Sequence, residues 1–184
     1  MTGIRSFVAV GIPSSMLDDI ARIQREIATG GLRLVKPELV HVTLKFLGNV
    51  PEEQIDEITE ALRGIRYMPF DAILKGMGAF PGRSIRVVWL GLEGNFLGLY
   101  QAVEDALASF GFERDKRGFS PHVTLGRVKN PSPEVSKQIS RKISQMGNVD
   151  LGSFHVDRFL LKKSTLTSGG PIYEDLAEFP LTDH

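Results

Sequence analysis

Two kinds of hydrophobic spacing alternate along the first part of the chain. The apolar run Ser6–Gly11 predicts a short strand. From about residue 14 to Ala28, apolar residues recur every three or four positions, which predicts an amphipathic helix with Ser14 or Ser15 as its N-cap. The pair Gly30–Gly31 ends that pattern.

The next segments predict a strand, a helix and a strand. Alternating apolar and polar residues from Leu39 to Leu47 are typical of a half-buried strand. A helix is expected to begin at Pro51, since the acidic residues that follow suit the positive end of a helix dipole. A further strand is expected over Phe70–Phe80.

The same order then begins again. Val87–Gly91 matches Phe7–Gly11 at a constant offset (91 − 11 = 80), and the apolar positions of the following helix keep this spacing. The string His-Val-Thr-Leu occurs at His41 and again at His122, with nearly the same offset (122 − 41 = 81). Alternating elements can arise by accident, but the agreement at individual apolar positions favours an internal duplication.

A duplication predicts the fold class. We expect an α+β protein whose residues 1–184 form a single bilobal domain, with repeats at approximately 4–80 and 84–163 and a C-terminal tail at 164–184. Each lobe is expected to hold a mostly antiparallel sheet with helices on its outer face. A pseudo-twofold axis between the lobes would leave a central cleft, with the two motif strands facing each other across it.

Composition removes several functional classes. The 184 residues include 22 basic and 22 acidic ones, so the chain lacks the basic surplus typical of proteins that bind long nucleic acids by charge. A local basic cleft is still compatible with this balance. Cysteine is absent, and neither a membrane span nor a secretion signal is evident. We expect a cytoplasmic monomer without membrane association.

The repeated motif predicts acid–base chemistry. Alternate side chains of a strand share a face, so His41 lies beside Thr43 and His122 beside Thr124. Two imidazoles on opposite sides of one substrate can remove a proton from an attacking oxygen and protonate a leaving oxygen. Threonine hydroxyls can bind the phosphoryl oxygens of a phosphodiester.

A cation near the motifs would stabilise the charge of a phosphoryl transition state. Arg127 follows the second motif and is the main candidate, while Lys45 is a weaker one, expected on the same face as His41. Phe46 is expected on the opposite face. Two basic segments, 114–117 and 162–163, are further candidates for contacts with flanking phosphates, although solvated surface is the commoner role of such segments.

Neither the motif histidines nor the other two suggest a metal site. Neither His41 nor His122 has the nearby second ligand of a zinc motif such as H-E-x-x-H, so we expect no metal and no cofactor. His155 is expected to be structural, and His184 is the terminal residue.

With these paired motifs the chain resembles a known family, the two-histidine (2H) phosphoesterases. Within that family it resembles the LigT-like RNA 2′,3′-cyclic phosphodiesterases, historically called 2′-5′ RNA ligases. The similarity covers nearly the whole chain. It rests on Arg5–Val10, Val35–Glu38, the extended first motif 41–48, the second motif with Gly126–Arg127, and the ending 171–173 with 179–181. Relatives commonly carry an aromatic residue where this chain has Leu34.

The resemblance implies metal-independent hydrolysis of a 2′,3′-cyclic phosphate, at an RNA end or in a cyclic nucleotide, to a 2′-phosphate. It implies catalysis by His41 and His122, with His41 hypothesised to protonate the 3′-oxygen and His122 to activate water. Thr43, Thr124 and Arg127 would hold the phosphoryl group. Phe7, Phe46, Phe119 or Tyr173 could stack on a base, although such aromatic residues are more often part of the core. Two alternatives are 2′-5′ ligation of tRNA halves and a non-catalytic module that binds RNA ends.

Overall fold

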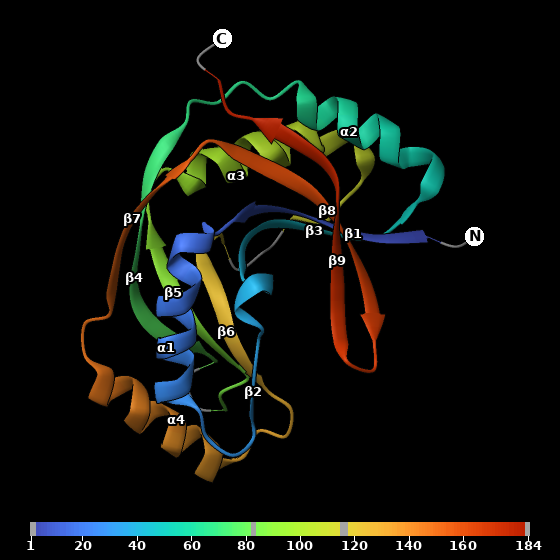
Figure 1. Ribbon diagram of the computed structural model, residues 1–184. Coiled ribbons are helices and arrows are strands. Elements are labelled where there is room, and N and C mark those ends of the chain that lie inside the picture. Colours follow the sequence, from blue (N-terminus) through green and yellow to red (C-terminus); the bar gives the residue numbers. More distant parts are fainter. Residues whose placement is uncertain (1–2, 82–83, 115–117, 183–184) are drawn as a thin grey trace.

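The computed structural model describes residues 3–81, 84–114 and 118–182. Within these ranges one curled sheet holds nine strands, eight of them in the order β7-β4-β5-β6-β3-β1-β8-β9, with β2 beside β6 (Figure 1). All paired neighbours run antiparallel. The strands are β1 (Gly3–Gly11), β2 (Leu32–Leu34), β3 (His41–Pro51), β4 (Phe70–Phe80), β5 (Val87–Glu93), β6 (His122–Val128), β7 (Asp150–Val156), β8 (Arg158–Thr167) and β9 (Gly170–Pro180).

Four α-helices pack on the outside of the sheet in the described part of the chain (Figure 1). They are α1 (Leu17–Ile27), α2 (Ile55–Arg63), α3 (Phe96–Ala106) and α4 (Pro133–Met146), and short 3₁₀ turns occupy Ser14–Met16, Pro37–Leu39, Glu52–Gln54 and Ala108–Phe110. Helix α1 packs against α4, and α2 packs against α3. None of the helices in the described ranges is long and apolar enough to cross a membrane.

A side-chain cap begins α4, whereas α1, α2 and α3 begin without one. In α4, the Ser132 hydroxyl accepts a hydrogen bond from the Val135 backbone N–H at 3.2 Å, and Pro133 fills the first turn. The N-cap predicted for the first helix is wrong. Ser14 and Ser15 lie in a 3₁₀ turn, and α1 begins after Met16 without a side-chain cap.

The two motif strands meet at the centre of the sheet. Val42 of β3 pairs with Val123 of β6, and the strands on either side correspond in order: β1 with β5, β8 with β4, and β9 with β7. The expected α+β architecture with two related lobes and a central cleft is therefore confirmed. Val42 and Val123 are fully buried on the helix side of the sheet.

The lobes do not coincide with consecutive halves of the chain. Strand β4 from the first half pairs with β5 and β7, whereas β8 from the second half pairs with β1. Each lobe therefore takes strands from both halves, and the proposed repeats 4–80 and 84–163 are segments of sequence and not separate bodies. Residues 164–182, expected as part of a tail, form the end of β8 and the edge strand β9.

A close contact between β4 and β5 leads to the first prediction. A Cβ atom on Gly78 would lie 2.3 Å from the ring of Trp89, the only tryptophan of the chain. We expect Gly78→Ala to displace this ring and to lower the free energy of unfolding by about 1–3 kcal/mol. Chemical denaturation followed by tryptophan fluorescence measures both effects. Gly11→Ala is the control, because its Cβ would meet nothing within 4 Å; an equal loss in both variants would contradict the prediction.

Candidate active site

Both copies of the motif line one cavity of about 950 Å³ on the inner face of the curled sheet. His41 and Thr43 reach it from β3, and His122 and Thr124 reach it from β6. The intervening apolar side chains point into the core, as strand alternation predicts. The structure thus brings together two pairs of side chains that lie far apart in the sequence (122 − 41 = 81).

The two imidazoles are held in the same way. Nδ1 of His41 lies 2.8 Å from the Leu39 carbonyl oxygen, and Nδ1 of His122 lies 2.7 Å from the Ser120 carbonyl oxygen. A carbonyl oxygen can only accept, so each Nδ1 carries the proton. In the neutral ring, Nε2 is then the atom with a free lone pair, and it can take up or deliver a proton in the cavity.

A β-bulge in the first motif strand changes which side chains reach the cavity. In the pairing of β1 with β3, Val8 lies opposite Lys45 and Ala9 lies opposite Thr43, so Leu44 is an extra residue. Both Leu44 and Lys45 are buried, while Phe46 is 66% exposed and lines the cavity. The expectation that Lys45 shares the face of His41 is therefore wrong, and so is the expectation that Phe46 lies opposite it.

Lys45 is instead part of a buried ion pair behind the sheet. Its Nζ donates to a Glu104 carboxylate oxygen at 2.6 Å and to the Glu113 carbonyl oxygen at 3.0 Å. The side chains of Lys45 and Glu104 are only 5% and 6% exposed. Lys45 does not line the cavity, and its ammonium group connects β3 to α3 and to the segment that leads to the second motif.

A matching bulge in β6 brings Arg127 into the cavity. In the pairing of β5 with β6, Val88 lies opposite Gly126 and Trp89 lies opposite Thr124, so Leu125 is the extra residue. Arg127 consequently lines the cavity together with His122. The equivalent position of the first half holds Phe46 (127 − 46 = 81), so the two sides of the site are alike in the His and Thr residues and differ here.

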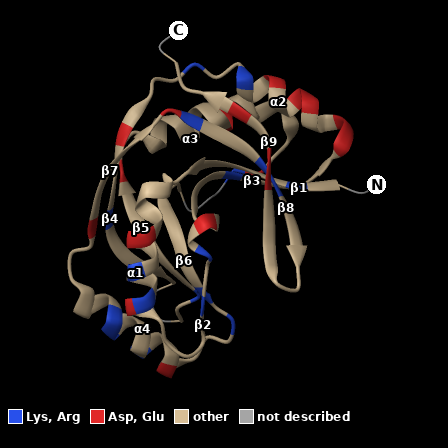
Figure 2. Cartoon of the chain, in the orientation of Figure 1, with Lys and Arg blue, Asp and Glu red and all other residues tan. Residues whose placement is uncertain are grey.

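Cations gather at the cavity although the whole chain has no net charge. Arg5, Arg33 and Lys36 line it with Arg127, and no aspartate or glutamate lines it in the described part of the chain. Arg33 of β2 lies directly opposite Arg127 of β6, and like charges in such a pair repel unless an anion lies between them. Figure 2 shows acidic residues gathered on α2 instead.

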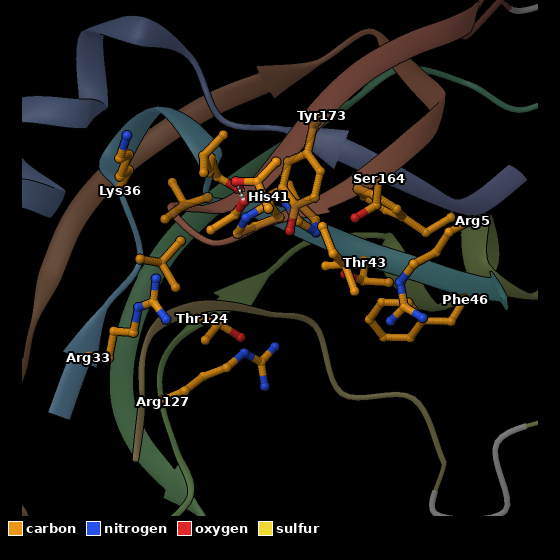
Figure 3. Close-up of a pocket in the computed structure, with 18 of the residues that line it drawn as sticks. Arg5, Arg33, Lys36, His41, Thr43, Phe46, Thr124, Arg127, Ser164 and Tyr173 are labelled. Atoms are coloured by element: carbon orange, nitrogen blue, oxygen red, sulfur yellow. Dashed lines mark hydrogen bonds between the residues drawn. The ribbon is translucent and has the colours of Figure 1, made fainter. Parts of the chain in front are cut away.

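Three of these cations were missed as site residues by the sequence analysis. Arg5, Arg33 and Lys36 lie outside the repeated motif, and their place at the cavity depends on how β1 and β2 pair with other strands. In Figure 3, Arg33 and Arg127 lie on one side of the pocket, while Arg5 and Phe46 lie on the other.

Aromatic side chains surround His41. Its ring centroid lies 4.8 Å from that of Phe7 and 5.4 Å from that of Tyr173. Both aromatic residues line the cavity, as expected for candidate binding residues. Burial raises the pKa of Tyr173 against the opposing charges of Arg127 and Arg5, so its hydroxyl stays protonated and can donate a hydrogen bond.

Other predicted contacts lie elsewhere or are not described. Phe119 stacks on Tyr100 at 4.5 Å between centroids and does not line the cavity. In the basic segment 114–117, residues 115–117 lie outside the described residues, and Arg114 pairs with Asp105. Lys162 and Lys163 pair with Asp175 and Glu174 across β8 and β9. Leu34, where the family resemblance led us to expect an aromatic residue, does line the cavity.

In the described part of the chain, His155 hydrogen-bonds to a single carboxylate. His155 is an exposed residue of β7, and its Nδ1 lies 2.8 Å from an Asp71 carboxylate oxygen on the neighbouring strand. Within residues 3–81, 84–114 and 118–182, no three histidine, cysteine, aspartate or glutamate side chains are grouped to hold a metal ion. The groups that surround the cavity are suited to an anion.

Burial lowers the pKa of His41 to about 4. Removal from water is the largest cause, the hydrogen bond to the Leu39 carbonyl opposes it, and electrostatic repulsion from Lys162, Arg127 and His122 lowers the pKa further. At neutral pH and without a bound anion, His41 is therefore uncharged.

Comparison with known proteins gives the class of this site. The sequence profile of the family described as LigT like Phosphoesterase matches residues 10–89 and 92–173, and each segment holds one motif. A protein named RNA 2′,3′-cyclic phosphodiesterase from Archaeoglobus fulgidus is 42% identical over 180 residues, which cover 96% of this chain and 99% of that protein. A protein of the same name from Methanocaldococcus jannaschii is 36% identical over 178 residues, which cover 96% of this chain and 100% of that protein.

Solved structures agree with the sequence comparison. The crystal structure of TT0787 from Thermus thermophilus has a TM-score of 0.82 at 30% identity and covers 96% of this chain and 97% of that chain. The structure of E. coli LigT complexed with 3′-AMP has a TM-score of 0.79 at 26% identity, and the match covers 98% of this chain and 99% of that chain. The chain belongs to the LigT-like phosphoesterase family, a branch of the 2H phosphoesterases. It is an enzyme of the phosphoesterase class.

The causes of the low His41 pKa lead to the second prediction. NMR titration of the histidine Cε1–H signals should give His41 a midpoint near 4, with the His41→Gln variant identifying the signal. In Arg127→Met the midpoint should rise, because a positive charge that disfavours the imidazolium is gone. An unchanged midpoint in that variant would show that Arg127 does not act on His41.

Proposed function

We propose that this protein hydrolyses 2′,3′-cyclic phosphates at RNA ends without a metal ion and leaves a 2′-phosphate. The observation that carries the proposal is the pair of imidazoles in one cavity, each with Nδ1 bound to a carbonyl oxygen and a threonine on its own strand beside it. The names of the relatives support the choice of substrate.

The proposed reaction is an in-line displacement at phosphorus. A water molecule loses a proton to one Nε2 atom as its oxygen bonds to phosphorus, and the bond to the ribose 3′-oxygen breaks. The other imidazole, in its protonated form, delivers a proton to that 3′-oxygen, so a 3′-hydroxyl and a 2′-phosphate result. General acid–base catalysis of this kind contributes about 10²–10⁴-fold for each group.

The phosphoryl oxygens would be held between the two strands. Thr43 and Thr124 offer hydroxyl donors from either side, and Arg127 adds a full positive charge beside Thr124 (Figure 3). Arg127 forms no ion pair with another described residue, so its guanidinium is available to the added negative charge of the transition state.

The rest of the cavity suits an RNA end. A volume of about 950 Å³ exceeds the space that one phosphate group needs. Arg5, Arg33 and Lys36 can contact further phosphates, and Tyr173 and Phe46 offer aromatic surfaces to bases. Because every residue that the proposed reaction uses comes from one chain, we infer that a monomer suffices, and we propose that it acts in the cytoplasm, where RNA substrates are found.

The decisive experiment uses an oligoribonucleotide that ends in a 2′,3′-cyclic phosphate, in excess EDTA, with analysis of the product end. The wild type should form a 2′-phosphate, and His41→Ala and His122→Ala should each lower kcat by about 10²–10⁴-fold. His155→Ala is the matched control, since this histidine lies on the outer strand β7 and should leave kcat unchanged. Absence of wild-type turnover would refute the proposal for RNA ends, and a rate abolished by EDTA would refute metal independence.

The assignment of His41 as the proton donor to the 3′-oxygen requires a change in its pKa. A group with a pKa of about 4 is deprotonated at pH 7, so the bound anion must raise that value. We expect the His41 midpoint to move towards neutrality when the NMR titration is repeated with saturating 3′-AMP. If the midpoint stays near 4 in the complex, His41 is the base and His122 the acid.

A further inference from the structure

One buried polar side chain behind the site has no part in the proposed chemistry. Gln24 lies on α1 and is 3% exposed. Its amide nitrogen donates two hydrogen bonds, to the Val35 carbonyl oxygen at 2.5 Å and to the Leu125 carbonyl oxygen at 2.9 Å. Burying an amide is unfavourable unless it forms such bonds, so this side chain is committed to two backbone segments that are far apart in the sequence.

Leu125 is the residue that forms the bulge of β6. The pairing with β5 passes from Thr124 to Gly126 and skips it. Its carbonyl oxygen accepts from the Val35 backbone N–H at 2.9 Å and from Gln24. Gln24 therefore holds the bulge and the segment between β2 and the first motif together from behind the sheet.

The bulge decides where Arg127 points. His122 and Arg127 are separated by an odd number of positions (127 − 122 = 5), and in a regular strand an odd separation puts two side chains on opposite faces. With Leu125 as an extra residue, both line the cavity. Gly126 makes room for the same arrangement, since a Cβ there would lie 2.9 Å from the Leu32 side chain and 3.1 Å from the Arg33 carbonyl oxygen.

In the other lobe, the bulge in β3 is also linked to a helix, but by an ion pair. Glu104 occupies on α3 the place of Gln24 on α1 (104 − 24 = 80), and Lys45 follows the bulge of β3. There an ion pair connects helix, bulge and the segment before the second motif. Behind Arg127 the corresponding side chain is a neutral amide, which secures the bulge and brings no carboxylate near the guanidinium.

We propose that Gln24 is the positioning residue of Arg127: by binding the Leu125 carbonyl it fixes the bulge that presents the guanidinium to the phosphoryl group. The inference rests on the proposed function for its effect on the rate. Its effect on anion binding does not depend on turnover, because inorganic phosphate probes the cation directly.

The test is a double-mutant cycle of Gln24→Met and Arg127→Met. Methionine keeps the length of the glutamine side chain and removes both donors. We expect Arg127→Met to lower kcat by about 100-fold and Gln24→Met by about tenfold, with less than about twofold change in KM. When Arg127 is already replaced, Gln24→Met should change kcat by less than about twofold, although it lowers the melting temperature in both backgrounds.

Phosphate affinity, measured by calorimetry on the same four proteins, gives the second readout. Gln24→Met should weaken phosphate binding only when Arg127 is present. An equal loss of phosphate affinity in both backgrounds would overturn the inference, even if no RNA substrate is turned over. A different result would be that Gln24→Met weakens phosphate binding only when Arg127 is present, while the wild type does not hydrolyse the cyclic phosphate. That result would refute the proposed function and keep Gln24 as the positioning residue.

Ser136→Ala controls for a general loss of stability. Ser136 lies on α4, is 6% exposed, and its hydroxyl accepts from the Ile85 backbone N–H at 3.1 Å, a bond that does not involve the bulge at Leu125. This variant should lose stability and keep the wild-type kcat and phosphate affinity. If it loses kcat as much as Gln24→Met does, the effect of Gln24 is merely structural and the inference is wrong.

Discussion

The pairing of β3 with β6 at Val42 and Val123 is the contact on which the rest of the site depends. It makes the two motif strands neighbours, and because their apolar side chains face the helices, both His-x-Thr pairs must face the opposite side. A shift of either strand by one residue would exchange the buried and cavity-facing sets. The apolar core thus fixes the register that brings the two histidines into one cavity.

The histidines are alike in their hydrogen bonds, but their surroundings differ. Aromatic rings flank both of them, and at His41 burial with nearby cations lowers the pKa. The equivalent bulges present Phe46 on one side of the cavity and Arg127 on the other. A reaction that needs one acid, one base and one site of charge stabilisation requires such asymmetry, and duplication alone would not supply it.

The charged residues at the cavity favour binding of an anion at a cost in stability. Arg33 and Arg127 lie opposite each other with no acidic residue among the described lining residues, an arrangement that costs stability in the free protein. The buried pair of Lys45 and Glu104 serves the opposite purpose, because its charges compensate each other behind the sheet. Cations that face the cavity are left for an anionic ligand, while those in the core are neutralised.

The sequence by itself determined much of this protein. Strand alternation placed each histidine beside its threonine, the nearly constant offset between the two halves predicted related lobes, and the paired motifs indicated the family. Only the tertiary structure decided that Lys45 points into the core, that Phe46 and Arg127 point into the cavity, and that Arg33 lies opposite Arg127. Alternation is a local property of consecutive residues. A bulge depends on partners such as Gln24 and Leu125, which are distant in the sequence and meet only in the folded chain.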